Sequence, residues 1–216
     1  MTTDRRLWEM ANSLRDPIRF AKWLWPDVVF YKQQRDIIYS VRDNDETFVA
    51  AGHQLGKDFV AGFIALWFFL TRHPCRVVTT SADHSQLEAV LWGEIRRYIS
   101  TSRIPLSVDQ GGPLVINHLH LRKVVHGELC GVSYMIGRQA SKGEGMAGHH
   151  CTPASGTYQP HDLPLTLFIA DEASGVDDLS YERADTWAKR KLVLGNPYEC
   201  QNFFRKGIKG GDLVAG

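Results

Sequence analysis

The stretch AAGHQLGKDFVAG, residues 50–62, decides how the rest of the sequence is interpreted. Residues 47–51 read as a short strand, and an apolar, helix-like segment begins at Lys57. A strand, a glycine-containing turn, Gly-Lys and a helix follow one another in a phosphate-binding loop (P-loop). In such a loop, backbone N–H groups and the helix N-terminus direct partial positive charge at phosphates. We therefore interpret this stretch as a candidate nucleoside triphosphate-binding loop.

The loop departs from the usual motif in two places. The usual four-residue spacing puts the first glycine at position 51, which is Ala51, with Gly52 one residue later. An aspartate also follows the lysine, where a serine or threonine is usual. A Gly-Lys turn without a ligand is therefore the alternative. The candidate ATP-binding residues of the loop are Gly52, His53, Gln54, Leu55, Gly56, Lys57 and Asp58.

Asp58 has two interpretations. It is a first-turn carboxylate that the helix dipole favours, or it replaces the usual hydroxyl as an oxygen ligand of Mg²⁺. The second interpretation adds negative charge near the phosphates, which the metal would have to offset. We favour the metal-ligand interpretation.

The stretch LTLFIADEASGVDD, residues 165–178, supplies the acidic groups that such a site needs. Residues 165–170 are mostly apolar and predict a buried strand, with Asp171 and Glu172 at its C-terminal end. Ligands bind at this end of the strands in open parallel sheets. We expect Asp171 to hold Mg²⁺ and Glu172 to act as the general base for water.

A third polar position follows the strand predicted at residues 191–194. The sequence KLVLGNPYEC, residues 191–200, places Asn196 at the same predicted edge of the sheet. Its amide is a candidate for contact with the γ-phosphate or the attacking water. A structural turn residue is the alternative.

The order of elements predicts an α/β fold with a mostly parallel central sheet covered by helices on both faces. Helices are expected at residues 5–14, 17–25 and 32–41, and an amphipathic helix at 81–99. Further strands are expected at 76–80 and 132–137, with an antiparallel edge hairpin at 114–126, on which His118 and His120 would point the same way. We expect residues 1–45 to form a helical extension and residues 46–216 the core.

Composition limits the classes of partner. Lys and Arg number 25 against 24 Asp and Glu, so net charge alone indicates no polyanionic partner. The apolar run at 59–70 is shorter than the ~20 residues of a membrane span, so no membrane partner is expected. Three short basic clusters are candidate DNA contacts, although most such clusters are solvated faces. They comprise Arg96, Arg97 and Arg103; Arg122 and Lys123; and Lys189, Arg190, Lys191, Arg205, Lys206 and Lys209.

The sequence resembles the ATPase domain of the large terminase subunit, the DNA-packaging motor of tailed bacteriophages. The resemblance covers most of the chain, and the last two of its motifs are the most specific. The motifs are FYKQQRDIIYSV (30–41), GHQLGKDFVAG (52–62), TTSADHSQLEAVLWGEI (79–95), GEGMAGHH (143–150), FIADEASGVDD (168–178) and LVLGNPYECQNFFRKG (192–207).

The resemblance implies several residue roles. It implies that Gln34 reads adenine, with Gln33 as the competing choice, and that Glu172 and Asn196 are the catalytic and coupling residues. His53 stands where many terminases carry an arginine. Arg138 resembles an arginine that acts in trans on a neighbouring subunit, and a surface arginine is the alternative.

The resemblance further implies a RecA-like P-loop NTPase of the additional-strand, catalytic-glutamate type. Its expected cofactors are ATP and Mg²⁺, and its expected partners are double-stranded DNA, a homo-oligomeric ring, the portal protein and the small terminase subunit. The expected location is the host cytoplasm, at the portal of the assembling procapsid. The C-terminal nuclease domain of complete large terminases is expected to be absent. A non-hydrolysing nucleotide- or DNA-binding module and a helicase-like ATPase are the alternative functions.

Overall fold

A computed structural model describes residues 15–52, 56–140, 145–152, 163–196 and 200–210. The predicted helix at 5–14 and the loop residues His53, Gln54 and Leu55 lie outside the described residues.

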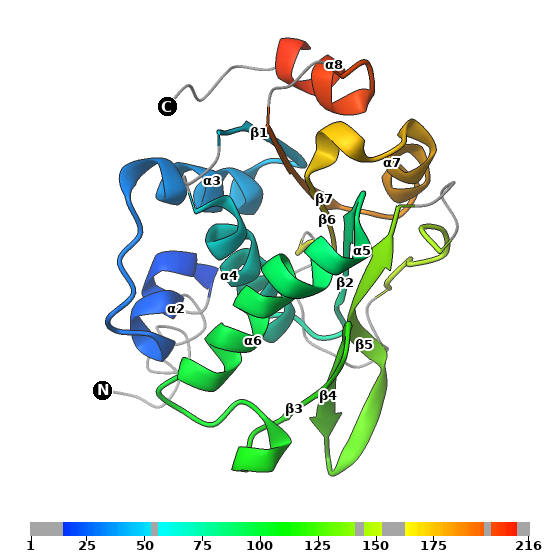
Figure 1. Ribbon diagram of the computed structural model, residues 1–216. Helices are drawn as coiled ribbons and strands as arrows, with labels where there is room; N and C mark the ends of the chain where they lie inside the picture. The colour runs from blue at the N-terminus through cyan, green and yellow to red at the C-terminus, as the bar shows by residue number, and fades with distance from the viewer. Residues whose placement is uncertain (1–14, 53–55, 141–144, 153–162, 197–199, 211–216) are drawn as a thin grey trace.

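In these ranges, seven strands form one sheet in the order β1-β7-β6-β2-β5-β4-β3 (Figure 1). The first five strands of this order pair in parallel, and β5, β4 and β3 pair antiparallel. The prediction of a mostly parallel sheet with an edge hairpin is confirmed. The strands are β1 (Glu46–Ala50), β2 (Arg76–Ser81), β3 (Leu114–Asn117), β4 (His120–Val125), β5 (Glu128–Gln139), β6 (Thr166–Asp171) and β7 (Arg190–Gly195).

The position of β7 is the feature that organises the sheet edge. β7 pairs with β1 on one side and with β6 on the other, so it separates the strand before the Gly-Lys turn from the strand that ends at Asp171. β7 is thus an additional strand between the other two. Because all three strands are parallel, their carboxyl ends lie along one edge.

Helices cover both faces of the sheet, and each face has its own core. One core joins α2, α3, α4 and α6 to the strands, and the other lies beneath α7 and α8. The helices are α2 (Pro17–Leu24), α3 (Lys32–Asp43), α4 (Lys57–Leu70), α5 (His84–Gln86), α6 (Trp92–Thr101), α7 (Asp178–Asp185) and α8 (Phe203–Gly210). The helices predicted at 17–25 and 32–41 are confirmed as α2 and α3.

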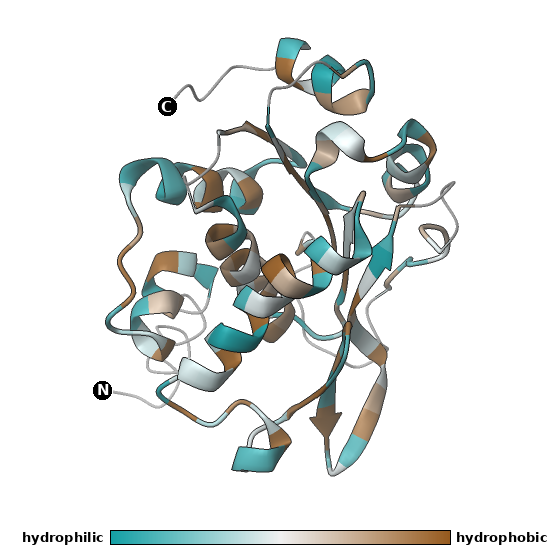
Figure 2. Cartoon of the chain, in the orientation of Figure 1, coloured by the Kyte–Doolittle hydropathy of each residue, from teal (hydrophilic) through white to brown (hydrophobic). Residues whose placement is uncertain are grey.

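Helix α4 is apolar around most of its circumference because it is enclosed by other elements. Figure 2 shows brown along its length, whereas α3 and α7 carry teal residues. Its side chains from Val60 to Phe69 are buried between the sheet and α6. Among the described residues, no helix is long and apolar enough to cross a membrane.

The prediction of one regular α-helix at 81–99 is wrong, because the helical segment is interrupted by a π-helical turn. The helical segment begins at His84, contains a π-helical turn at Leu87–Leu91 and continues as α6. Just after the π turn, the Trp92 indole N–H donates to Thr79 Oγ1 of β2 at 2.9 Å. A π turn adds one residue to a helical turn, and this hardly changes the apolar periodicity of the sequence. The π turn could therefore not be predicted from that periodicity.

The edge hairpin forms as predicted, but its two histidines do not share a strand. His118 lies in the turn between β3 and β4 with φ 52°, whereas His120 begins β4. His118 Nε2 therefore lies 3.6 Å from Glu88 Oε1, whereas the His120 ring lies against the Tyr134 ring, with centroids 6.3 Å apart. The prediction that they point the same way is wrong because the turn reverses the chain between them.

The close packing of α8 on β1 gives a stability prediction. A Cβ added at Gly207 would lie 2.3 Å from a Phe48 ring carbon. We expect Gly207→Ala to lower the free energy of unfolding by about 1–3 kcal/mol, because overpacking outweighs alanine's helix propensity. Urea unfolding measures this. Gly93→Ala on α6 is the control, since no atom lies within 4 Å of its added Cβ, and it should stabilise by about 0.5–1 kcal/mol.

Candidate functional site

The candidate site lies at the carboxyl-end edge of β1, β7 and β6, where α4 begins. Gly56 precedes the helix with φ 65° and ψ 32°, a left-handed conformation that glycine adopts without strain. Lys57 is the first residue of α4, and its side chain is buried. The local chemistry of the Gly-Lys pair thus sets both the turn and the start of the helix.

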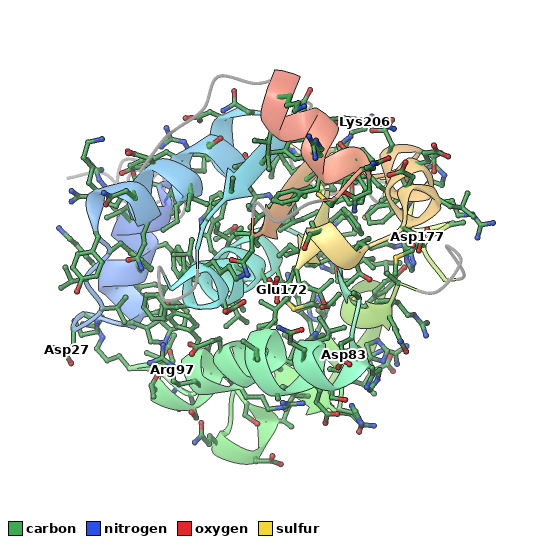
Figure 3. All side chains as sticks on the ribbon, turned by 45° about the horizontal axis from the view of Figure 1, so that its top comes forward. Asp27, Asp83, Arg97, Glu172, Asp177 and Lys206 are labelled. Carbon is green, nitrogen blue, oxygen red and sulfur yellow. The ribbon has the colours of Figure 1, made fainter. Side chains whose placement is uncertain are left out.

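An ion pair joins the two halves of the site. Lys57 Nζ donates to Glu172 Oε1 at 2.5 Å, although the two residues are 115 positions apart in the sequence. Figure 3 shows Glu172 near the middle of the molecule, where the ribbon of α4 meets the turn after β6. The fold therefore brings together the predicted phosphate-binding lysine and the predicted general base.

Asp171 is a buried carboxyl group with spare bonding capacity. It is 1% exposed, and its Oδ1 accepts the Glu172 backbone N–H at 2.9 Å. Its Oδ2 is buried without a hydrogen-bond partner within the described part of the chain. Burial, reinforced by the negative charge of Asp58, raises the pKa of Asp171 to about 8. This environment disfavours the ionised carboxylate, and a nearby cation would lower the free-energy cost of its charge.

Asp58 belongs to the same carboxyl pair. Burial raises the pKa of Asp58. Its interaction with the Asp171 carboxyl group and the positive charge of Lys57 lower this pKa, and the negative charge of Glu172 raises it further. No group of three or more potential metal ligands converges among the described residues. Mg²⁺ needs only one or two carboxylates when phosphates and waters supply the rest of its shell. The unsatisfied Asp171 oxygen beside Asp58 fits that requirement.

The backbone of Glu172 is a feature that the sequence did not indicate. Glu172 has φ 46° and ψ 47°, the left-handed region that non-glycine residues seldom occupy. Such a conformation costs of order 1–3 kcal/mol and persists only where the surroundings hold it. It lets the chain turn sharply at the end of β6, and the side chain meets Lys57 there.

Gln34, rather than Gln33, lies against the Gly-Lys turn. Its side chain is 7% exposed, and its Oε1 accepts the Tyr31 backbone N–H at 3.1 Å. A Cβ added at Gly56 would lie 2.9 Å from Gln34 Nε2. Gln33 is exposed. Of the two candidates, the structure therefore places only Gln34 next to the turn; its role stays a prediction.

The other predicted residues occupy different surroundings. Asn196 directly follows β7 and is buried, as expected for a residue at this edge. Arg138 is exposed near the end of β5, opposite Thr80 of β2. Because β2 lies between β5 and β6, Arg138 is two strands away from Asp171.

Ser81 is a polar residue at this edge that sequence reasoning missed. It ends β2, is the register partner of Asp171, and its buried Oγ has no hydrogen-bond partner among the residues described. Its signal in the sequence is its place directly after the strand predicted at residues 76–80.

The basic clusters are largely engaged within the chain. Lys123 Nζ donates to the Arg72 carbonyl at 2.5 Å, and Lys191 forms ion pairs with Glu46 and Asp185. Arg97 pairs with Glu94 at 2.7 Å. Lys206 is 73% exposed, although it lies 3.4 Å from Asp178. Sequence alone could not separate the buried lysines from exposed ones.

Comparison with solved structures identifies the fold. The Thermus phage P74-26 large terminase ATPase domain matches with a TM-score of 0.59 and 16% identity over 91% of this chain and 76% of that one. The large terminase from a second, thermophilic bacteriophage matches with a TM-score of 0.53 and 12% identity. That match covers 78% of this chain and 39% of the other protein.

A third structure is the large terminase of the same thermophilic bacteriophage in complex with ATP-gamma-S. It matches with a TM-score of 0.51 and 13% identity, over 78% of this chain and 38% of that one. No protein-family model matches the sequence, and no curated protein matches it. The likeness therefore lies in the architecture rather than in the sequence. The chain has the fold of large-terminase ATPase domains.

The raised pKa of Asp171 gives a pH prediction. Its folded-state pKa of about 8 exceeds the ordinary value of 3.8, so the folded state binds this proton more tightly than the unfolded state. The stability contributed by this group therefore falls as pH rises through that range. We expect the melting temperature of Asp171→Asn, relative to wild type, to increase between about pH 5 and pH 9, without nucleotide or Mg²⁺.

Differential scanning calorimetry measures this difference. Asp27→Asn changes an exposed carboxyl group distant from Glu172 (Figure 3). The difference in melting temperature between this variant and wild type should not change with pH. A flat profile for Asp171→Asn as well would contradict the raised pKa.

Proposed function

We propose that this chain is the Mg²⁺-dependent ATPase motor domain of a viral large terminase, which couples ATP hydrolysis to movement of double-stranded DNA. The observation that carries the proposal is the 2.5 Å contact between Lys57 and Glu172 beside the buried Asp171. Similarity of fold to large-terminase ATPase domains supports it. In this proposal residues 46–216 form the ATPase core and residues 1–45 its helical extension.

Phosphate binding is assigned to Lys57 and the N-terminus of α4. The helix N-terminus presents backbone N–H groups to an anion, and Lys57 adds a full positive charge. Gly52 and Gly56 would allow the backbone to approach the phosphates. A phosphate held by Lys57 competes with Glu172 for the same ammonium group.

Metal binding is assigned to Asp171, with Asp58 beside it. Bound Mg²⁺ would neutralise phosphate charge and polarise the terminal phosphoryl group. Asp171 is buried at the end of β6, and Asp58 is half-buried in the first turn of α4, so both carboxyl groups adjoin the proposed phosphate site. Bound Mg²⁺ would also offset the extra negative charge that Asp58 brings to the loop.

Water activation is assigned to Glu172. When a phosphate takes the Lys57 ammonium, the Glu172 carboxylate loses its ion-pair partner and becomes free to accept a proton from water. The left-handed backbone of Glu172 fixes the start of this side chain. The ion pair thus links occupancy of the loop to availability of the base.

Coupling to DNA is assigned to residues around this centre. Asn196, buried after β7, would contact the γ-phosphate, so that its presence or loss changes the position of this residue. Exposed Arg138 would act on a neighbouring subunit of a homo-oligomeric ring. A DNA-translocating ring needs only backbone contacts to DNA, irrespective of sequence. Lys206 and its basic neighbours on α8, Arg205 and Lys209, are the candidates. The portal protein, the small terminase subunit and the procapsid site in host cytoplasm belong to this proposal.

A non-hydrolysing nucleotide-binding module is the second candidate. It is favoured by Asp58, because a carboxylate after the lysine adds negative charge where phosphates bind. The Lys57–Glu172 pair favours the ATPase, since a module that only binds has no need of a base held at the lysine.

Substitution of the base tests the proposal. We expect Glu172→Gln to lower Mg²⁺-dependent phosphate release by about 10²–10⁴-fold, because an amide cannot accept the proton. ATP affinity should stay equal or rise, since the substitution removes the competitor for Lys57. Steady-state phosphate release and equilibrium ATP binding, with and without double-stranded DNA, measure the two effects.

Glu182→Gln, on the exposed side of α7, is the matched control and should behave as wild type. Undiminished turnover by Glu172→Gln would reject Glu172 as the base. Tight ATP binding by wild type without turnover, at every chain concentration tested, would establish the binding module instead.

Nucleotide selectivity tests Gln34 against Gln33. We expect Gln34→Ala to raise KM for ATP by about tenfold and to reduce the preference for ATP over GTP, because a hydrogen-bonding amide is lost. Gln33→Ala should leave both unchanged, since that side chain is exposed. Competition of GTP with ATP in the hydrolysis assay measures the preference. Equal effects of the two substitutions would contradict the assignment.

A further inference from the structure

The turn after Glu172 is built from few bonds of its own. The Gly175 N–H donates to the Glu172 carbonyl at 3.0 Å, and the Val176 N–H donates to the Ala173 carbonyl at 3.2 Å. These bonds close one 3-10 turn, Ala173–Gly175, directly after the left-handed residue. A residue in a sparsely populated backbone region keeps its conformation only where neighbours over-determine it.

Asn202 supplies the missing restraint from a distant part of the chain. Its Nδ2 donates to the carbonyls of Ala173 (2.7 Å) and Val176 (2.7 Å), and lies 3.3 Å from the Ser174 carbonyl. An asparagine amide has two N–H donors, so the two short bonds use both. Carbonyl oxygens on this side require the nitrogen to face them, which settles the orientation of the amide.

Packing leaves the turn little freedom to relax. A Cβ added at Gly175 would lie 2.8 Å from Ala82, and one added at Gly195 would lie 2.9 Å from the Phe204 ring and 3.2 Å from the Ala173 nitrogen. The turn is therefore confined between the segment after β2 and the end of β7 with α8. A shift of α8 must therefore either move the turn or stretch the hydrogen bonds that the Asn202 amide makes to it.

Asn202 is itself fixed by the start of α8. The Phe203 N–H donates to Asp178 Oδ1 at 2.6 Å, and its ring stacks on Tyr181 with centroids 4.3 Å apart. Phe204 is fully buried. In Figure 3, Lys206 marks α8 on the far side of the turn from Glu172. Asn202 thus stands at the junction between an anchored helix and the turn that carries the proposed base.

We propose that Asn202 is a positioning residue that holds Glu172 in its left-handed conformation and transmits the position of α8 to it. The assignment rests on the proposed role of Glu172 as general base. The Asn202 amide nitrogen donates to backbone carbonyls of the turn, and its proposed effect on the reaction therefore passes through Glu172. Loss of its donors releases the turn while leaving Lys57 and the Gly-Lys turn in place.

The test compares Asn202→Ala and Asn202→Asp with Gln201→Ala. Asn202→Asp keeps the size of the side chain and replaces the donor by an acceptor, while Gln201 is an exposed neighbour. Both Asn202 variants should lower kcat for ATP by about tenfold or more and change KM by less than about threefold, and Gln201→Ala should change neither. Amide hydrogen exchange at residues 173–176 should speed up in the Asn202 variants alone.

Hydrogen exchange separates the failure of this inference from the failure of the proposed function. If wild type does not hydrolyse ATP but exchange speeds up in both Asn202 variants, the role of Asn202 in the turn stands and the ATPase proposal falls. If wild type hydrolyses ATP and the Asn202 variants match it in kcat or in exchange, the inference is overturned. A parallel loss of kcat and of ATP affinity would also overturn it, because that pattern indicates general damage.

Discussion

The parallel pairing of β1, β7 and β6 is the constraint on which the rest of the structure depends. It places the Gly-Lys turn, Asp171 and Asn196 along one edge, although they are far apart in the sequence. The ion pair between Lys57 and Glu172 closes this edge at 2.5 Å. If the three strands were antiparallel, their carboxyl ends would alternate between opposite edges, and the same residues could not meet.

The site combines three unfavourable features, each with a local physical cause. Asp171 is a buried carboxyl whose charge is disfavoured, Asp58 adds a second carboxyl beside it, and Glu172 has a left-handed backbone. The interactions that offset these costs come from elsewhere: the Lys57 ammonium, the closing bonds of the turn and the Asn202 amide. Strain and buried charge concentrate at functional sites, and their concentration at this edge agrees with the proposed ATPase.

The buried Lys57 and Lys191 and the half-buried Lys123 show how one residue type serves different purposes in this fold. Lys57 faces carboxyl groups at the candidate site, whereas Lys191 is held between Glu46 and Asp185 at the opposite ends of the strands. Lys123 lies over the Phe69 ring and donates to a carbonyl. Basic clusters counted in the sequence therefore overstate the surface that could contact DNA. The exposed members include Arg205, Lys206 and Lys209 on α8, and Arg97, Arg103 and Lys189 elsewhere.

The sequence by itself determined the fold class and the candidates at the edge, because strand-turn-helix order and apolar strands ending in acids are local patterns. It predicted Lys57 at the start of a helix and Asp171, Glu172 and Asn196 at strand ends, and the structure places them there. Only the tertiary structure decided that β7 lies between β1 and β6, that Gln34 rather than Gln33 faces Gly56, and that Glu172 is left-handed. It also decided that the Asn202 amide holds the turn. These features depend on which distant segments pack against one another, and periodicity along a single chain does not specify that.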